Sequence, residues 1–531
     1  MKLNERSLAN RSQWLEHGFE LPEYNRAEMR ARTRKNPMWL HFGAGNLFRA
    51  FPALCQQWLL NAGLSDRGII IADNADMVEK NFRQHNELSL TVTLCPDGSI
   101  EKVVVGSIAE AVSRLEDSVR LCEIFCSPSL QMVSFTITEK GYRLKDSSGK
   151  YVEDVEHDML AGPSFSISYM GRLVAMLYQR YCKGATPLAL VSMDNCSHNG
   201  EMLRNAFVSF AEAWVKSGAC EQGFLDYVSD ERCVAFPWSM IDKITPRPDA
   251  QVREMLLRDK FDDVAGFVTK RGTYVAPYVN AEKTQYLVIE DNFPNGRPPL
   301  EKAGIYFTDR TTVERAESMK VCTCLNPLHT ALAIFGCLLG YTLINEEMKD
   351  PNLLAMVRRI GYDEGLPVAE DPGILSPRAF LDEVINERFP NPFLPDSPQR
   401  IACDTSQKLP VRFGVTVKSY LVRDDMSRLK MIPFVFSGWC RYLLGVDDEG
   451  NPFEVSPDPM LEELRGILGG IRLGDAPREG VLMPIYSNAA IFGVDLYSTS
   501  LAKQIEDDFW AMVQGPGMVR KMLQRKLEEF R

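Results

Sequence analysis

Three residues that can support acid–base chemistry lie within ten positions of one another, from Lys320 to His329. The segment is KVCTCLNPLH, and a long apolar stretch follows it. A lysine held near apolar groups and other cations can lose its proton close to neutral pH and act as a general base. The carboxamide of Asn326 can donate a hydrogen bond to an oxyanion. Together these groups meet the two requirements for oxidising an alcohol or reducing a ketone.

The pair Asn326-Pro327 predicts the start of a helix. Asparagine is a favoured N-cap, and proline fits the first helical position because its missing N–H is not needed there. Asn326 and His329 would then share the first turn, with Lys320 in the preceding segment. The alternative is a surface lysine followed by an ordinary helix cap, and one local pattern does not separate these interpretations.

Length and composition predict a globular protein of two or three domains. The chain has 531 residues, of which 45% are hydrophobic and 25% charged. A net charge of −11 and a pI near 5.3 argue against a protein that coats nucleic acid or a membrane surface. We therefore expect no nucleic-acid or membrane partner, while a small anionic substrate remains compatible with a locally cationic site.

The N-terminal segment lacks the apolar core of a signal peptide. The longest apolar stretch, residues 331–344, is shorter than a membrane span of about 20 residues, so we expect a buried helix there. Cys322 and Cys324 have no partner motif of metal-ligand type, and the chain has no C-x-x-C pair. These features predict a cytoplasmic protein with reduced thiols and no metal site.

Hydrophobic patterns divide the chain into three parts. Residues 1–36 are charged and predict an N-terminal extension. From residue 37 to about 310, apolar strands alternate with helices, which predicts a Rossmann-type, doubly wound α/β domain. The predicted strands are residues 39–43, 68–73, 103–105, 132–138 and 188–193. After a segment rich in Pro, Gly and Asn at 292–299, residues 311–531 predict a mainly α-helical domain. Its predicted helices are residues 312–324, 328–347, 379–387, 426–444 and the stretch from 501.

A glycine turn at Gly43-Ala44-Gly45 follows the first of these strands and precedes a helix, as a dinucleotide site requires. Its glycines allow a tight turn and a close approach of the pyrophosphate. Phe48 stands where the fingerprint has a third glycine. Asp73 closes the next strand, where a carboxylate can bind ribose hydroxyls and repel the 2′-phosphate of NADP. The alternative is a glycine turn with a chance acidic strand end.

Polar residues end two later strands. Asp194-Asn195 and residues 137–142 follow apolar segments, at the edge where such sheets bind ligands. A strand-terminating Asx turn is the alternative for the first pair. Arg400 and Lys408 flank residues 403–406, and solvated surface charges are the simpler interpretation of each taken alone.

Several segments in the same order resemble the mannitol dehydrogenase family, the polyol-specific long-chain dehydrogenases. They are residues 43–50 (GAGNLFRA), 138–142 (TEKGY), 194–195 with 199–200, 236–246 and 288–293 (VIEDNF). The resemblance runs from about residue 38 to the C-terminus. Within the family it is greatest to the fructuronate reductases, through residues 406–410 (SQKLP), 438–442 (GWCRY) and 445–447.

The resemblance implies a Rossmann-type domain, a helical domain and a metal-independent site that uses NAD. It implies that Lys320 is the general base and that Asn195 and Asn326 stabilise the oxyanion. Lys320 and Asn326 lie one residue further apart than in the family's pattern. The substrate-binding residues implied are His329, Asp242, Arg400 and Lys408. The cofactor-binding residues implied are Gly43, Gly45, Asn46, Leu47, Asp73, Glu139 and Asn195.

The predicted activity is the NADH-dependent reduction of a keto sugar acid, D-fructuronate, to its aldonate, D-mannonate. Arg400 is suited to a bidentate contact with a carboxylate, which Lys408 would support with a point charge. Mannitol 2-dehydrogenase and tagaturonate reductase are the alternative enzymes, and an NAD-binding sensor without activity is the alternative outside enzymes. The expected partner is a small sugar acid or polyol, and the expected assembly is a monomer or homodimer.

Overall fold

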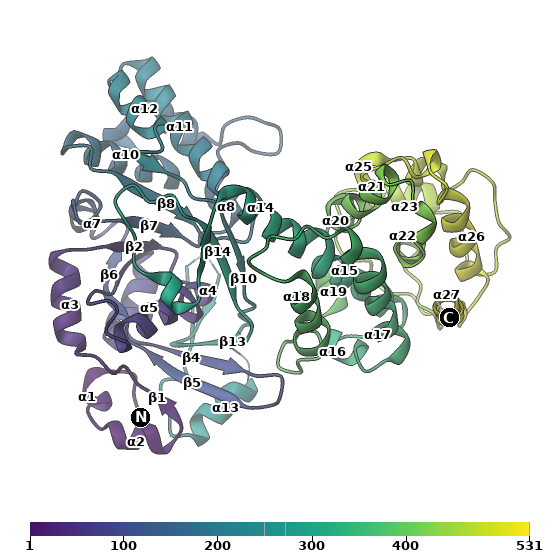
Figure 1. Cartoon of the computed structure of the whole chain (residues 1–531), viewed down its shortest axis with the longest axis horizontal. Coiled ribbons are helices and arrows are strands. Elements are labelled where there is room, and N and C mark those ends of the chain that lie inside the picture. Colours follow the sequence, from purple (N-terminus) through teal and green to yellow (C-terminus); the bar gives the residue numbers. More distant parts are fainter. Residues whose placement is uncertain (249, 271, 530–531) are drawn as a thin grey trace. The chain divides into compact units, whose positions relative to one another are not determined.

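The computed structural model of the chain describes residues 1–248, 250–270 and 272–529. Contacts divide it into two compact units, Met1–Glu314 and Arg315–Arg531. The first unit combines sheets and helices, and the second is built of helices (Figure 1). The predicted order of an α/β domain followed by a helical domain is confirmed.

A parallel sheet of six strands forms the centre of the first unit, in the order β6-β3-β2-β7-β8-β9 (Figure 1). Chain order reverses between β2 and β7, so the loops after these strands diverge and leave a crevice for a ligand. The bounds are β2 Trp39–Phe42, β3 Ile69–Asp73, β6 Ile108–Ser113, β7 Met132–Phe135, β8 Leu188–Ser192 and β9 Val234–Ala235.

Side chains alternate between the two faces of this sheet. Leu40 and Phe42 join one core cluster with residues of α10 (Tyr169–Cys182) and α11 (Asn199–Ser217). Trp39 joins the opposite cluster with residues of α5 (Pro52–Asn61). Because helices bury both faces, the central strands are mainly apolar, as predicted for a parallel sheet, with polar exceptions such as the buried His41 and Ser134.

One predicted strand belongs to a different sheet. Residues 103–105 lie in β5 (Ile100–Val105), which joins a second sheet ordered β1-β5-β4-β13. Its other strands are β1 Phe19–Glu20, β4 Ser89–Leu94 and β13 Tyr278–Glu282. The third strand of the Rossmann-type sheet is instead β6, which the prediction missed. Its sequence IAEAVS is rich in small residues and carries Glu110, so it lacks the long apolar run of its neighbours.

The first 36 residues pack within the first unit. They form α1 (Glu5–Leu8), α2 (Arg11–Glu16), β1 and α3 (Arg26–Lys35). Strand β1 pairs in parallel with β5, with Phe19 opposite Lys102. Residues predicted as an extension therefore contribute a strand to the second sheet.

The remaining strands of the first unit lie beside the Rossmann-type sheet. A third sheet has the order β10-β14-β15, and β11 and β12 form a hairpin. The bounds are β10 Ser239–Asp242, β11 Phe267–Val268, β12 Tyr274–Val275, β14 Tyr286–Glu290 and β15 Tyr306–Thr308. Short helices connected to these sheets include α4 Asn46–Ala50, α7 Ser118–Phe125, α8 Glu139–Tyr142, α12 Gln222–Ser229 and α13 Ala250–Arg258.

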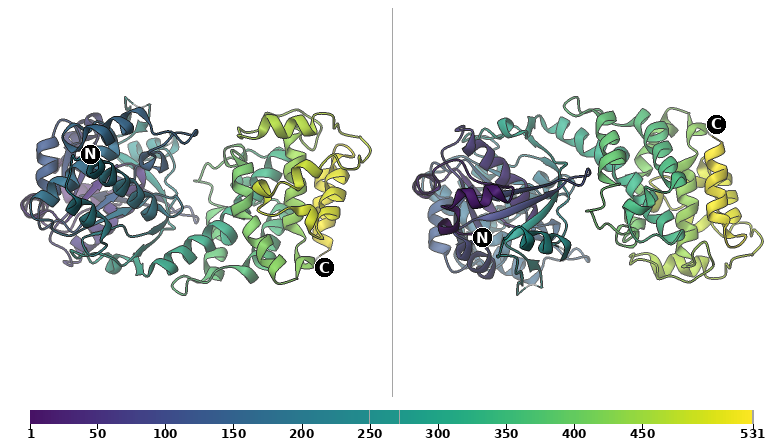
Figure 2. Two further views of the ribbon diagram at one scale, coloured as in Figure 1. Left: turned by 90° about the horizontal axis from the view of Figure 1, so that it is seen from above. Right: turned by 90° about the horizontal axis from the view of Figure 1, so that it is seen from below.

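The second unit consists mainly of helices, as both views in Figure 2 show. A helical run begins at α14 (Arg310–Ser318), continues as a π-helix at Met319–Cys324 and resumes as α15 (Asn326–Leu338). Later helices include α17 Pro351–Arg358, α18 Pro377–Glu383, α19 Pro398–Ile401, α20 Thr405–Arg412, α21 Gly414–Val422, α22 Met431–Leu443, α23 Leu461–Leu468, α26 Ala502–Val513 and α27 Met518–Glu528. Within the described ranges, the run Arg310–Leu338 alone has the length and composition to cross a membrane, and 83% of its most apolar window is buried inside the protein, as in a core helix.

Two predicted details of this run are wrong. Asn326 is the first helical residue, and Leu325 occupies the N-cap position without a side-chain cap. The helix predicted over 328–347 ends at Leu338, because Gly340 takes a left-handed φ of 78°, and a short helix follows at Ile344–Glu347. Glycine reaches this conformation without strain, which is why it commonly ends helices.

Glu364 generates a pH-dependent contribution to stability. Its buried carboxylate accepts the backbone N–H groups of Lys430, Met431 and Ile432 at 2.6–2.8 Å, at the start of α22. Burial raises the pKa of Glu364 to about 7. The folded protein therefore keeps this proton between about pH 4.5 and 7, where the unfolded chain has lost it, so its contribution to stability falls as pH rises.

We expect Glu364→Gln to remove this dependence. Relative to the variant, the unfolding free energy of the wild type should fall by roughly 3 kcal/mol between about pH 4.5 and 7. Urea unfolding over that range measures the difference, with Glu463→Gln on the exposed face of α23 as the control. Parallel curves for the wild type and Glu364→Gln would contradict the assignment.

Candidate functional site

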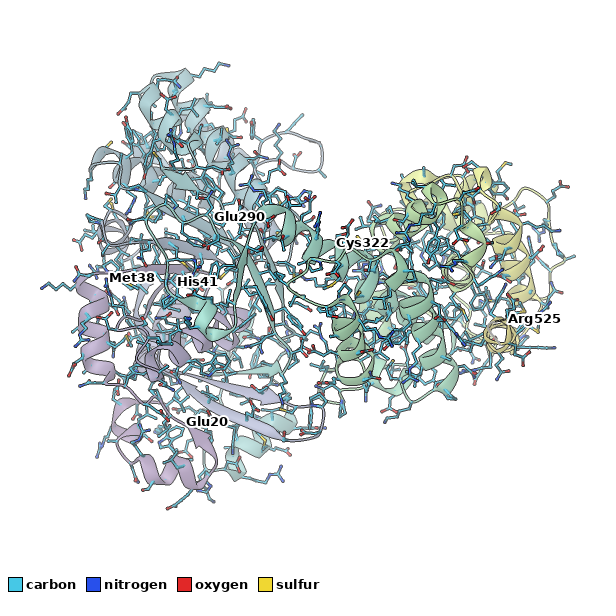
Figure 3. All side chains as sticks on the ribbon, viewed as in Figure 1. Glu20, Met38, His41, Glu290, Cys322 and Arg525 are labelled. Carbon is cyan, nitrogen blue, oxygen red and sulfur yellow. The ribbon has the colours of Figure 1, made fainter. Side chains whose placement is uncertain are left out.

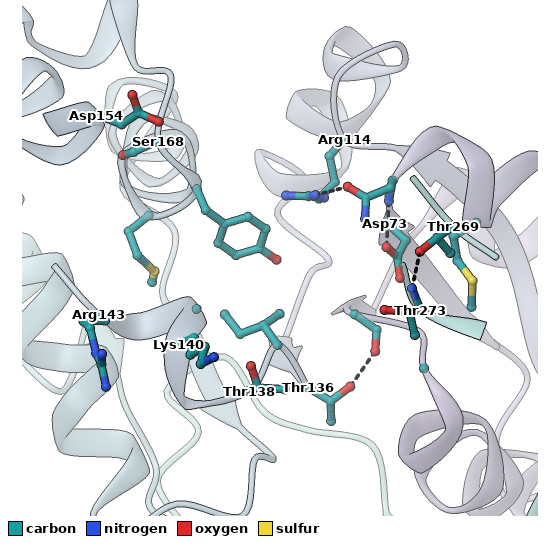
Figure 4. Close-up of a pocket in the computed structure, with 18 of the residues that line it drawn as sticks. Asp73, Arg114, Thr136, Thr138, Lys140, Arg143, Asp154, Ser168, Thr269 and Thr273 are labelled. Atoms are coloured by element: carbon teal, nitrogen blue, oxygen red, sulfur yellow. Dashed lines mark hydrogen bonds between the residues drawn. The ribbon is translucent and has the colours of Figure 1, made fainter. Parts of the chain in front are cut away.

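A cavity of about 630 Å³ opens in the first unit where the strands of the parallel sheet end (Figure 4). It brings together the glycine turn, the end of β3, the loop after β7 and the start of α10. Its walls include Gly43, Gly45, Asp73, Asn74, Arg114, Thr136, Ile137, Thr138, Lys140, Gly141, Ser168, Tyr169, Met170, Thr269, Thr273 and Val275. Thr269 and Thr273 come from the β11–β12 hairpin, a wall that the sequence did not predict.

The glycine turn has the shape that a phosphate-binding turn requires. Gly43 has a φ of 90°, and a Cβ there would lie 2.2 Å from the carbonyl oxygen of Thr136. No atom lies within 4 Å of the position where Gly45 would carry a Cβ. Gly45 is also the N-cap of α4, whose first turn no side chain caps. The backbone is therefore open to a pyrophosphate at this point.

His41 supports this turn from inside the sheet (Figure 3). Its Nδ1 lies 2.7 Å from Ser134 Oγ and its Nε2 lies 3.0 Å from Thr136 Oγ1. The ring stacks on Phe48 at 3.9 Å. Burial lowers the pKa of His41 to about 3, so the imidazole is neutral at pH 7. Phe48 stands where the dinucleotide fingerprint has a third glycine, and its stack on His41 packs α4 against β2.

Asp73 lies in the wall of the cavity and also orders the glycine turn. Its Oδ2 accepts the N–H of Ala44 at 2.9 Å, and its Oδ1 accepts the N–H of Asn74 at 2.7 Å. Each carboxylate oxygen keeps further lone pairs for a ligand hydroxyl. An acidic group therefore lies at the end of the second strand, as predicted, and it also holds the glycine turn in place.

Asp194 joins the ends of β7 and β8. Its carboxylate accepts the N–H groups of Ile137 and Thr138, each at 2.9 Å, and the hydroxyl of Tyr142 at 2.5 Å. Burial raises the pKa of Asp194, and these hydrogen bonds oppose the shift. Burial, then Asp194, raises the pKa of Tyr142 well above its usual value. Thr138 has a φ of 64°, a strained backbone that the carboxylate holds in place.

Asn199 connects the Asp194 loop to the strand that carries Asp242. Its Nδ2 donates to Asp194 O at 3.0 Å and to Ser239 O at 2.9 Å. Its Oδ1 accepts the N–H of Ser239 at 3.0 Å. Ser239 begins β10, and the buried Asp242 ends it. Asn195 is exposed beside Asp194 at the end of β8. The first unit thus holds Asn195 and Asp242 on connected segments.

Lys320 lies in the π-helix of the second unit and is only 2% exposed. The N–H of Leu325 donates to the Lys320 carbonyl at 3.1 Å, so this turn contains one residue more than an α-turn. This π-turn lies in the segment between Lys320 and Asn326. The carbonyl of Cys322 accepts the Thr416 hydroxyl at 3.2 Å, which satisfies one group freed by the irregular turn.

His329 faces an acid that the sequence did not reveal. Its Nε2 lies 3.5 Å from Asp396 Oδ2, and Asp396 also forms an ion pair with Arg400. Burial lowers the pKa of His329 to about 4; Asp396 opposes the shift, while Arg412, Arg400 and Arg388 add to it. The imidazole is therefore neutral at pH 7 and can donate or accept a hydrogen bond.

A cationic cluster surrounds this histidine, formed by Arg388, Arg400, Lys408 and Arg412. The Lys408 ammonium donates to the carbonyls of Ile401 and Cys403, the first at 3.2 Å. Burial and then the charge of Arg412 lower the pKa of Lys408. Burial lowers the pKa of Arg412 to about 10. Cations gathered in this way can attract an anion within an otherwise acidic protein.

The structure distributes the predicted residues over the two units. Gly43, Gly45 and Asp73 line the cavity, whereas Asn46, Leu47 and Glu139 do not appear among its lining residues. Lys320, Asn326 and His329 lie along one helical run in the second unit, with Arg400 and Lys408 on α19 and α20. Sequence reasoning missed His41, Thr138, Tyr142, Arg388, Asp396 and Arg412. Thr138 and Tyr142 had a signal, as the first and last residues of the TEKGY segment.

Within the described residues, no group of three or more His, Cys, Asp or Glu side chains is arranged to hold a metal ion.

Two family models match the chain. The mannitol dehydrogenase Rossmann domain matches residues 37–302, and the mannitol dehydrogenase C-terminal domain matches residues 312–513. D-mannonate oxidoreductase of Thermotoga maritima is 49% identical over 534 residues, covering 99% of this chain and 98% of the relative. Mannitol 2-dehydrogenase of Pyricularia oryzae is 30% identical over 508 residues, covering 93% of each.

Solved structures are similar over the whole chain. Substrate-free D-sorbitol dehydrogenase has a TM-score of 0.78 at 24% identity, covering 96% of this chain and 97% of its own. Mannitol 2-dehydrogenase of Pseudomonas fluorescens, in a ternary complex with NAD and D-mannitol, has a TM-score of 0.71 at 26% identity, covering 100% and 99%. The chain belongs to the mannitol dehydrogenase family of oxidoreductases, as the resemblance predicted.

The Asp194 carboxylate should be a major source of stability in the first unit. We expect Asp194→Ala to lower the unfolding free energy by about 2–4 kcal/mol, because it leaves the N–H groups of Ile137 and Thr138 without their acceptor and removes one partner of the Tyr142 hydroxyl. Tyr142→Phe should cost less, since both N–H bonds remain. Thermal unfolding measures both effects, and Asp226→Ala on the exposed side of α12 is the control. Equal melting temperatures for all three variants would contradict this role.

Proposed function

We propose that this protein is an NAD-dependent oxidoreductase that interconverts a keto sugar acid and its aldonate, D-fructuronate and D-mannonate. The cationic cluster around His329 carries the proposal, because an uncharged polyol offers it no partner. The D-mannonate oxidoreductase relative supports the same substrate pair. We also propose that the protein is cytoplasmic and that it acts as a monomer or a homodimer.

The cavity of the first unit is the proposed NAD site. The open backbone at Gly45 suits the pyrophosphate, and Asp73 suits the ribose hydroxyls and disfavours a 2′-phosphate. The mannitol 2-dehydrogenase structure with bound NAD supports this assignment. When bound, the nicotinamide exchanges a hydride with the carbonyl carbon of the substrate. The chain's own task here is to hold the cofactor in a fixed position and orientation.

Lys320 is the proposed acid and base. Its burial supports this role, because a lysine that is only 2% exposed is held in place and shielded from bulk water. In reduction it gives a proton to the carbonyl oxygen, and in oxidation it removes the hydroxyl proton. Asn195 and Asn326 are the proposed hydrogen-bond donors to the developing oxyanion. The proposal requires Lys320 and Asn195 to act on the same substrate.

Arg400 and Lys408 are the proposed contacts for the substrate carboxylate. Arg400 is 64% exposed and already pairs with Asp396, so the substrate would share or replace that partner. A planar guanidinium suits a carboxylate better than an ammonium does. Neutral His329 and the buried Asp242 are suited to hydrogen bonds with sugar hydroxyls.

Mannitol 2-dehydrogenase activity is the second candidate. The existing ion pair between Arg400 and Asp396 favours it, because a guanidinium already neutralised in this way would need no anionic substrate. The two mannitol 2-dehydrogenase relatives support it as well.

Replacement of Lys320 tests the acid–base role. We expect Lys320→Ala to lower turnover by about 10² to 10⁴, the usual cost of losing acid–base assistance, with NADH binding retained. Steady-state rates and the NADH fluorescence titration are measured on the same sample. Lys418→Ala, on an exposed position of α21, should keep the wild-type rate. A near-normal rate for Lys320→Ala would refute the assignment.

Replacement of Arg400 tests the charge of the substrate. We expect Arg400→Ala to raise the KM for fructuronate by about tenfold or more, since a charged hydrogen bond contributes about 1.5–3 kcal/mol. Arg400→Lys should recover part of the loss. Arg378→Ala, an exposed arginine of α18, is the control. Unchanged KM for fructuronate, with efficient use of fructose, would favour the second candidate.

A further inference from the structure

A second cavity of about 370 Å³ lies in the first unit between α7 and α10. Its deeper walls are apolar and include Phe42, Leu121 and Leu173. Two residues, Arg114 and Tyr169, line both this side cavity and the larger cavity that contains Asp73. The two cavities therefore meet at this pair, and neither residue was assigned a role by the sequence.

Arg114 is held in a fixed position beside Asp73 (Figure 4). It follows the end of β6, and its N–H donates to the Asp73 carbonyl at 2.9 Å. Its guanidinium Nη2 donates to Asn74 Oδ1, and the guanidinium carbon lies 4.5 Å from the centroid of the Tyr169 ring. Contacts on its edge and on one face thus fix the plane of this side chain.

We infer that the adenine ring of the bound dinucleotide stacks against Arg114 at the mouth of the side cavity. This inference rests on the proposed NAD site. With the pyrophosphate at the glycine turn and the ribose at Asp73, the base extends from the ribose on the side away from the turn. Asn74 and Arg114 are the next residues there, on the ends of β3 and β6.

The chemistry of this position suits a neutral aromatic ring. A guanidinium is planar, delocalised and weakly hydrated, so it stacks on aromatic faces. Leu115, which is 62% exposed, adds apolar surface at the rim of the side cavity. Burial of a base against these groups would cover apolar area that water now contacts. Arg114 is then a positioning residue, which holds the adenosine half and does not touch the reacting atoms.

Displacement of NADH by cofactor fragments tests this assignment without any turnover. Adenosine, AMP and nicotinamide mononucleotide are titrated against NADH fluorescence in the wild type and in variants. We expect Arg114→Ala to weaken adenosine and AMP by about 10- to 100-fold, the usual effect of removing a stacking partner, while nicotinamide mononucleotide changes little. Arg297→Ala is the matched control, because Arg297 also stacks on an aromatic ring, Phe307 at 3.5 Å, but lines neither cavity.

Arg114→Lys separates stacking from charge. It keeps the positive charge and loses the plane, so we expect it to weaken adenosine nearly as much as Arg114→Ala does. Tyr169→Leu provides the same readout if Arg114→Ala does not fold, and it should weaken adenosine as well. Weakening of AMP but not of adenosine would place Arg114 on a phosphate and overturn the inference. Unchanged adenosine displacement in Arg114→Ala, or none in the wild type, would also overturn it.

Failure of the proposed function and failure of the adenine assignment give different results in these experiments. NADH that binds but is not oxidised with any keto sugar would reject the activity and leave the adenine assignment testable by displacement. Absence of NADH binding would reject both.

Discussion

Parallel pairing of β3, β2, β7 and β8 is the constraint on which the first unit depends. Their carboxyl ends must meet at one edge, so residues distant in sequence, such as Gly43, Asp73 and Thr138, line one cavity. Two buried side chains then fix the loops at that edge. His41 holds the glycine turn, and the Asp194 carboxylate holds the strained backbone at Thr138. The loops of the proposed cofactor site are therefore held in position by buried groups beneath them, which need not contact a ligand.

In the second unit the corresponding constraint is the burial of charge. Lys320 and His329 lie on one helical run, and a π-turn separates the lysine from Asn326. Buried cations cost free energy unless they are paired or hydrogen-bonded. Asp396 and the carbonyls of Ile401 and Cys403 satisfy part of this requirement. The proposed function assigns the remaining positive charge to an anionic substrate, in a chain whose net charge is −11.

Sequence patterns predicted the elements whose burial is uniform. Strands β2, β3, β7 and β8 are mainly apolar, so they were found with errors of a few residues. Strand β6 was missed because an edge strand needs no continuous apolar run, and residues 103–105 were misplaced because apolar character does not say which sheet a strand joins. The π-turn at Lys320 was not predictable, since it depends on contacts such as that between Cys322 and Thr416.

The same limit applies to the site. Gly43, Gly45 and Asp73 have positions in a known pattern, so their place at the cavity could be predicted. Asp396, Arg388 and Arg412 act through tertiary contacts with His329 and have no local pattern that marks them. The sequence analysis made no prediction for Arg114, which is marked by its tertiary contacts with Asn74 and Tyr169.

The most direct test of the proposed activity is a panel assay of NADH oxidation. Absorbance at about 340 nm is followed with fructuronate, tagaturonate and fructose in parallel, at equal concentrations and without added metal. The account predicts rapid oxidation with fructuronate and a kcat/KM at least about tenfold lower with fructose, which lacks the carboxylate that one charged contact would bind. Tagaturonate carries the same carboxylate, so its rate reports on the configuration of the hydroxyls. Equal or faster oxidation with fructose would contradict the assignment of the cationic cluster to a substrate carboxylate.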